Sequence, residues 1–148
     1  MQASIVEMRV VGLAELTKAM RELPVEVHAS ALRPAVSAAA GVVQKDARLR
    51  APRDTGTLAK AIYRTRSRSL SSGTMETAIV GVRFGKRYRK RGQDAWYWKF
   101  IEFGTSKMAA RPFLRPAFES TKKKQLDAMV LSLKKGIARA AEKLRRKG

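Results

Sequence analysis

The sequence predicts an α+β fold in which a small antiparallel sheet packs against an alanine-rich helix and a long C-terminal helix. Two long segments, 25–50 and 116–146, carry apolar residues at helical spacing. Between them, 58–69 and 74–84 read as the strands of a hairpin around a Gly-containing turn. With 148 residues, 45% of them hydrophobic, the chain can bury a core, so we expect one domain over residues 1–148.

At the N-terminal side, residues 5–11 alternate apolar and polar side chains and predict a short strand. Apolar residues then recur at helical spacing over 13–23, and Pro24 separates this first helix from the second. The second helix, 25–50, contains Pro34, which predicts a kink or a restart. Its apolar stripe consists mainly of small residues that allow close approach of another element: Val27, Ala31, Ala35, Ala39, Val43 and Ala47.

The segment Asp54-Thr-Gly-Thr-Leu58 predicts a turn after the second helix. Asp54 and Thr55 can accept hydrogen bonds from nearby backbone N–H groups, and Gly56 can adopt a positive φ angle. No second carboxylate, histidine or nucleophile lies near Asp54 in the sequence, which argues against a catalytic role for it. We therefore expect this segment, with Leu58 as its apolar end, to be structural.

Arginine side chains alternate along the first strand of the predicted hairpin, at Arg64, Arg66 and Arg68. Alternation places all three on one face, which cannot be a buried core, so that face is either solvated or meets a negative partner. In the second strand, alternate apolar residues share a face: Ala78, Val80, Val82 and Phe84.

Two further groups of basic residues are candidate interaction sites. The segment Arg83 to Arg91 has six basic residues in nine and predicts a mobile basic loop over 83–94. Such a loop is either solvated or in contact with phosphate or an acidic protein surface. Its candidate contact residues are Lys86, Arg87, Arg89, Lys90 and Arg91. The helical C-terminus, 140–148, ends in a second basic group that includes Arg145 and Arg146.

The aromatic segment 96–103 predicts a third strand, which Gly104 ends. Glu102 is the one acid among these aromatic residues, and we expect it to pair with an arginine. Two prolines then predict a stiff corner, with Pro116 in the first turn of the C-terminal helix. The apolar seam of that helix steps by four and three residues: Leu126, Val130, Leu133, Ile137, Ala140 and Leu144.

Composition limits the classes of function. Thirty-two Lys and Arg against twelve Asp and Glu give a net charge of +20, which favours nucleic acid, acidic protein or anionic lipid as a partner. The chain has no cysteine, one histidine, no Gly-rich phosphate loop and no paired carboxylates, so we expect no enzyme activity, cofactor or metal. No apolar run approaches the ~20 residues of a membrane span, which argues against a membrane-spanning segment. The basic residues do not line one amphipathic helix, which argues against a membrane-surface protein.

Four segments together resemble a known family. They are Ala47-Arg-Leu-Arg-Ala-Pro52, Asp54-Thr-Gly-Thr-Leu58, Ile101-Glu-Phe-Gly-Thr-Ser106 and Arg111-Pro-Phe-Leu-Arg-Pro-Ala-Phe118. In this order and spacing the chain, over about 13–144, is similar to the gene-ten-like neck proteins of lambdoid long-tailed bacteriophages, described as tail components or head–tail joining proteins. The motif residues are Thr55, Gly56, Leu58, Glu102, Gly104, Thr105, Arg111, Pro112, Phe113 and Pro116.

The resemblance implies a virion structural protein, made in the host cytoplasm, that forms a homo-oligomeric ring at the neck. Such a ring joins the head connector or head-closure protein to the tail terminator or tail tube, and genomic DNA passes down its bore. The resemblance also implies an α+β fold. The charge of +20 leaves a second hypothesis open, a non-specific nucleic-acid-binding protein whose affinity falls steeply with salt.

Overall fold

The computed structural model describes residues 14–72 and 75–148. The strand predicted at 5–11 lies outside them. In chain order the elements are α1 (Ala14–Glu22), α2 (Val25–Arg50), α3 (Thr57–Ala61), β1 (Ile62–Arg66), β2 (Ala78–Val82), α4 (Lys86–Arg89), α5 (Trp98–Phe103), α6 (Leu114–Ser120) and α7 (Lys122–Lys147).

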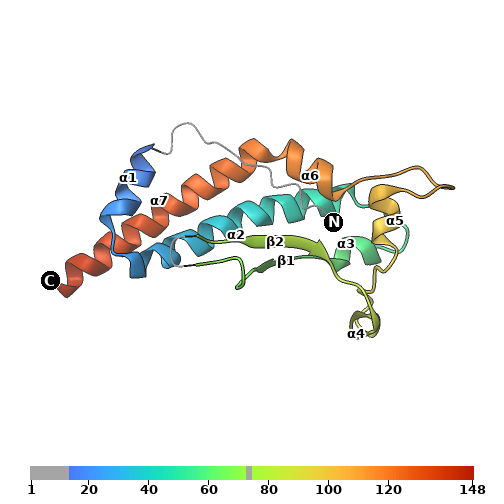
Figure 1. Ribbon diagram of the computed structural model, residues 1–148, viewed down its shortest axis with the longest axis horizontal. Helices are drawn as coiled ribbons and strands as arrows, with labels where there is room; N and C mark the ends of the chain where they lie inside the picture. Colours follow the sequence, from blue (N-terminus) through green and yellow to red (C-terminus); the bar gives the residue numbers. More distant parts are fainter. Residues whose placement is uncertain (1–13, 73–74) are drawn as a thin grey trace.

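Helices α2 and α7 lie side by side and form the long body of the molecule (Figure 1). The predicted stripe of α2 faces this contact, and Ala31 and Ala35 are fully buried. The predicted seam of α7 supplies Leu133 and Ala140, which are also buried. At Gly136 an added Cβ would lie 3.0 Å from the Cα of Ala31. Small residues on both helices therefore set the distance between them.

Helix α1 confirms the first predicted helix, and α2 confirms the second with the same bounds. Of the two outcomes predicted at Pro34, a kink or a restart, the restart does not occur, because one helix continues through this residue. Pro34 lies on the exposed side of α2, where the carbonyl left without a helical N–H partner can bond to water. The buried alanines on either side of Pro34 hold the helix against its neighbour.

The two strands pair antiparallel, from Ile62 opposite Val82 to Arg66 opposite Ala78, and both contact α2 (Figure 1). Ile62 and Val82 are buried in the core. The sequence indicates that Phe84 shares a face with Val82, but in the structure it does not. The strand ends at Val82, and Phe84 lies beyond it with its side chain exposed.

The first predicted strand is shorter than expected, because residues 57–61 form the helix α3 and only 62–66 are β1. Gly56 has a φ angle of 76° and starts the helix, and its carbonyl accepts a hydrogen bond from the N–H of Lys60. Leu58 and Ala61 are both buried and lie three residues apart, a helical spacing rather than the alternation of a strand.

The predicted strand at 96–103 is wrong, because its second part forms the helix α5. Trp98 and Ile101, three residues apart, pack against the core, while Phe100 and Phe103 face solvent. As predicted, the element ends at Gly104, whose φ angle is 74°. Aromatic content favours a strand, but here the burial of side chains three residues apart requires a helix.

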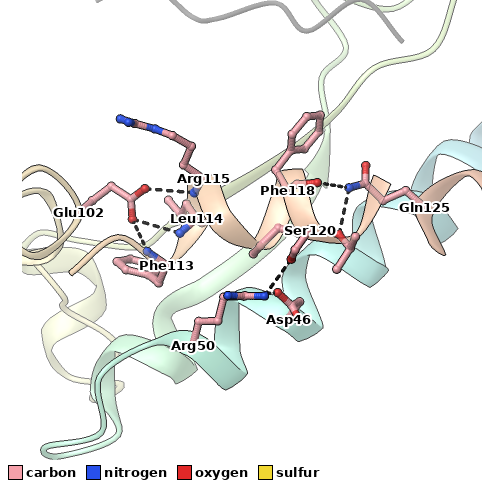
Figure 2. Close-up of polar contacts among 11 residues, drawn as sticks. Asp46, Arg50, Glu102, Phe113, Leu114, Arg115, Phe118, Ser120 and Gln125 are labelled. Carbon is pink, nitrogen blue, oxygen red and sulfur yellow. Dashed lines mark hydrogen bonds and ion pairs between the residues drawn. The ribbon is translucent and has the colours of Figure 1, made fainter. Parts of the chain in front are cut away.

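The predicted C-terminal helix is two helices, α6 and α7, that meet at Thr121. The Thr121 hydroxyl donates to the carbonyl of Ala117 at 2.6 Å. Gln125 Nε2 donates to the carbonyl of Phe118 at 2.7 Å (Figure 2). These side chains bond carbonyls near the helix end, where backbone partners are lacking. Pro116 lies in the first turn of α6, as the sequence predicted.

The predicted fold class, a small antiparallel sheet packed against an alanine-rich helix and a long C-terminal helix, is confirmed. The protein is mostly helical, with a two-stranded antiparallel sheet on α2 and the long α7 packed on the same helix. Within the described residues, none of the helices has both the length and the apolar character needed to cross a bilayer.

Candidate assembly surface

The carboxylate of Glu102 organises the corner between α5 and α6. Its Oε2 accepts hydrogen bonds from the backbone N–H groups of Phe113 (2.8 Å) and Leu114 (3.0 Å), and its Oε1 from that of Arg115 (3.1 Å) (Figure 2). These N–H groups open α6 and have no partner within that helix. Glu102 is itself buried, so one side chain satisfies three backbone donors where water is excluded.

Glu102 therefore does not bond as predicted, because backbone N–H groups take the place of the expected arginine. Phe113, beside these bonds, is fully buried and belongs to the main core cluster. Pro112 and Arg111 precede it on the exposed side, and the Arg111 N–H donates to the Ile101 carbonyl at 2.8 Å. The corner is thus tied to α5 by side-chain and backbone bonds.

The loop between α5 and α6 projects from one end of the molecule (Figure 1). Thr105 and Met108 bond to each other through their backbones at 2.9 and 3.3 Å. At Gly104 an added Cβ would lie only 2.8 Å from the Ala110 nitrogen, and its φ is positive. Only glycine fits this position without strain, which accounts for the motif residue Gly104. The Thr105 side chain accepts a hydrogen bond from the N–H of Lys107 through Oγ1 at 3.3 Å.

The Asp54–Leu58 turn lies against α5, although 40 residues separate them in sequence. Leu58 is buried in the core, and Thr55 Oγ1 accepts a long hydrogen bond, 3.4 Å, from the N–H of Thr57. A groove of about 330 Å³ runs between this turn, Phe100 and Met108. Pro52 and Ile101 also line this groove, so the fold brings residues of three of the four sequence motifs to the same surface.

Four aromatic side chains near α5 are exposed to solvent and form what we call the aromatic surface: Phe84 (51% exposed), Trp96 (63%), Phe100 (47%) and Phe103 (56%). Trp96 and Phe100 are in edge contact, with ring centroids 6.2 Å apart. Single exposed hydrophobic residues are ordinary, but an aromatic group such as this is typical of a contact site for another macromolecule.

Two cations lie beside rings of the aromatic surface. The Lys99 ammonium lies 5.9 Å from the ring centroid of Phe84 and 5.8 Å from that of Trp98, and the Arg115 guanidinium lies 5.9 Å from that of Phe103. Trp98 Nε1 is buried without a hydrogen-bond partner among the described residues. The rim of this surface is therefore basic.

The three strand arginines do not form one row. Arg64 extends across α2 at Gly41, where an added Cβ would lie 2.1 Å from the Arg64 Nη1 atom. Arg66 binds Glu76 through both carboxylate oxygens, with Nη2 3.2 Å from Oε2. Arg68 lies beyond the end of β1 and is exposed. The structure thus sets Arg68 apart, while Arg64 and Arg66 line the same groove beside α2.

The ion pair between Arg66 and Glu76 changes the titration of both side chains. The hydrogen bond from Arg66 lowers the pKa of the Glu76 carboxyl below its ordinary value, and the same bond raises the pKa of Arg66. Arg33 of α2 adds a second cation, with its Nε 3.8 Å from Glu76 Oε2. Glu76 is therefore held in its charged form at neutral pH.

The basic segment 83–94 contains the one-turn helix α4 rather than an open loop. Asp94 ties its two sides together, because Oδ1 accepts from the Gly85 N–H at 2.6 Å and Oδ2 lies 3.5 Å from Arg89 Nε. Arg83 is half-buried and donates to Gln93 Oε1 at 3.1 Å. The other basic side chains of the segment face solvent: Lys86, Arg87, Arg89, Lys90 and Arg91. They remain available as contact residues on a fixed turn.

The other basic group lies at the opposite end of the molecule, in the last turn of α7 (Figure 1). Arg145 and Arg146 are both exposed. Arg146 pairs with Glu142 one turn earlier, at 2.6 Å, in an exposed contact that contributes little to stability. The structure therefore does not bring Arg145 and Arg146 together with the cations of α4.

Sequence reasoning missed the exposure of Phe100 and Phe103 because it placed them in a covered strand. If residues 98–103 are placed on a helix, Phe100 and Phe103 lie on the side opposite Trp98 and Ile101. A helical interpretation of this segment therefore predicts an outer aromatic face. The contact between Arg64 and Gly41 had no sequence signal, because it depends on the packing of β1 on α2.

A buried core beside an uncovered aromatic surface with a basic rim is typical of a protein that assembles with other macromolecules. Residues 14–104 match the model of the family described as "Bacteriophage HK97-gp10, putative tail-component". This match covers more than half of the chain, which therefore belongs to this family of phage tail components, as the sequence motifs indicated. Comparisons with curated proteins and with solved structures give no match.

Proposed function

We propose that this chain is a virion structural protein that forms a ring at the neck of a tailed phage. In this role the ring joins the head connector to the tail tube or tail terminator, and DNA passes through it. Membership of the tail-component family supports a place in the virion. The observation that carries the assembly role is the aromatic surface, which the chain leaves uncovered beside its stiff corner.

A non-catalytic role is part of this proposal. The two carboxylates that the described fold covers most are already bonded, Glu102 to three backbone N–H groups and Glu76 to arginines. A general base needs an oxygen within reach of a substrate proton. Neither carboxylate offers one, which fits a part of a particle rather than an enzyme.

Light scattering after size exclusion tests the assembly role, on the chain alone and mixed with purified connector and tail-tube proteins. We expect a larger complex in at least one mixture. The variants Trp96→Ser and Phe100→Ser should prevent it while melting like the parent chain, because they alter only exposed side chains. Leu144→Ser, which changes an exposed apolar residue in the last turns of α7, is the matched control and should assemble normally.

The role in infection is tested with phage that lack the gene. We expect filled heads and separate tails that do not join, visible by electron microscopy. Particles that join and infect normally without this protein would refute the proposal, as would aromatic-surface variants that assemble as well as the parent chain.

A further inference from the structure

A basic groove of about 300 Å³ lies between α2 and the hairpin, away from the aromatic surface and α5. The side chains that give it its chemistry are Arg33 and Ser37 of α2, Arg64 and Arg66 of β1, and Glu76 and Thr77 before β2. Three guanidinium groups face one carboxylate among the lining residues, so the groove carries an excess of positive charge.

The groove already holds one oxyanion, the Glu76 carboxylate. Arg66 donates hydrogen bonds to both of its oxygens, and Arg33 Nε lies 3.8 Å from its Oε2. The Glu76 side chain is only 3% exposed, whereas those of Arg33 and Arg66 are 55% and 36% exposed. The guanidinium groups thus present donors to solvent while the carboxylate lies behind them. An oxyanion arriving from solvent would meet the cations first.

Arg64 is the cation in this groove without an internal partner. Among the side chains that the structure describes, no carboxylate lies within ion-pair distance of it. Its guanidinium lies over Gly41, where only the absence of a Cβ allows it to sit. Gly41 continues the helical line of Arg33 and Ser37 at four-residue spacing. Arg64 therefore extends the cationic wall along α2.

We propose that this groove binds a phosphate group of a nucleic-acid backbone, with Arg33, Arg64 and Arg66 as the contact residues. Guanidinium groups bind phosphate oxygens through paired N–H donors, and the hydroxyl of Ser37 adds a neutral donor. The net charge of +20 attracts a polyanion to the surface. The inference does not depend on ring assembly, because one chain contains the whole groove.

Fluorescence anisotropy of a labelled DNA duplex, on the intact chain at about 50 and 200 mM salt, tests this inference. Arg64→Ala should weaken binding about tenfold and lower the salt slope by about one. The matched control is Arg53→Ala, which removes one exposed arginine from the turn after α2 and should change affinity less than about twofold.

Gly41→Ala tests whether DNA binding depends on the position of the Arg64 guanidinium and not only on its charge. The new methyl group would displace the Arg64 guanidinium, which is the flexible end of a side chain, without changing net charge. We expect it to weaken DNA binding about as much as Arg64→Ala while leaving thermal stability intact. Glu76→Gln should strengthen binding several-fold, because it removes the internal anion.

A titration of inorganic phosphate into the 15N-labelled chain distinguishes a free ion from a backbone phosphate. Amide shifts at Ser37, Gly41 and Thr77 that also occur with DNA support the groove. Equal losses for Arg64→Ala and Arg53→Ala, or unchanged binding by Gly41→Ala, would overturn it. So would failure of the parent chain to bind DNA, or Arg64-dependent binding to poly-glutamate alone.

Discussion

One buried carboxylate holds the corner that connects α5 to α6. Glu102 receives three N–H groups from consecutive residues, 113–115, and two of the family motifs meet at this contact. A carboxylate suits this position because each of its oxygens can accept more than one hydrogen bond. The corner in turn fixes the base of the projecting loop and one side of the aromatic surface.

Replacing Glu102 with alanine should lower the free energy of unfolding by about 3 kcal/mol, because several covered N–H groups lose their acceptor. Glu102→Gln should cost less, since its amide keeps one acceptor oxygen. Urea denaturation followed by circular dichroism measures both. Glu119→Ala, an exposed acid of α6, is the control and should shift stability by less than about 0.5 kcal/mol. Equal values for positions 102 and 119 would contradict this account.

The ion pairs of Glu76 make stability depend on pH. Because the folded state lowers the pKa of this carboxyl, its contribution is fully present above the ordinary value of 4.5 and is lost as pH falls through the lower folded value. The parent chain should therefore exceed Glu76→Gln in urea midpoint at pH 7, and the difference should shrink toward about pH 3. A midpoint difference that does not change with pH would argue against a charged pair.

At the scale of elements, the contact between α2 and α7 is the main joint of the molecule. It uses alanines on α2 and Gly136 on α7, so the backbones approach closely. The same helix α2 supports the sheet on another side. The basic groove, which lies between α2 and the strands, therefore depends on the same long helix as the contact with α7.

Gly136→Leu should lower the free energy of unfolding by about 2 kcal/mol, because a side chain there would collide with the backbone of Ala31. Lys134→Leu places the same side chain on the exposed side of α7 and is the control. Urea denaturation compares the two. If both variants unfold alike, the close approach of the helices does not limit side-chain size at Gly136.

At the scale of the whole molecule, the charge is large for the size of the fold. The described ion pairs involve only a few of the thirty-two basic residues, and basic groups lie at both ends of the long axis (Figure 1). Like charges on one compact body repel each other. Contact with acidic neighbours or DNA in the particle would relieve this repulsion.

Sodium chloride should therefore stabilise the isolated chain. We expect the melting temperature to rise by several degrees between about 20 and 500 mM, because the Debye length falls from tens to a few ångströms. Differential scanning calorimetry measures the shift, with potassium chloride as a control for specific sodium effects. A melting temperature that falls with either salt would contradict the role of self-repulsion.

The sequence by itself determined the long helices, the hairpin and the family. Regular spacing over several turns specifies a helix such as α2 whatever it packs against. The motifs at 47–52 and 54–58 and the start of the motif at 101–106 lie within residues 14–104, which match the phage family. Short segments carry too few turns for this, so the patterns of α3 and α5 also fit strands.

Only the tertiary structure decided which side chains meet. The acceptor role of Glu102 depends on the chain returning eleven residues later, and the site of Arg64 depends on the packing of β1 against Gly41. Burial and pairing arise from contacts between distant segments, which a local pattern does not encode. The aromatic surface and the basic groove follow from those contacts.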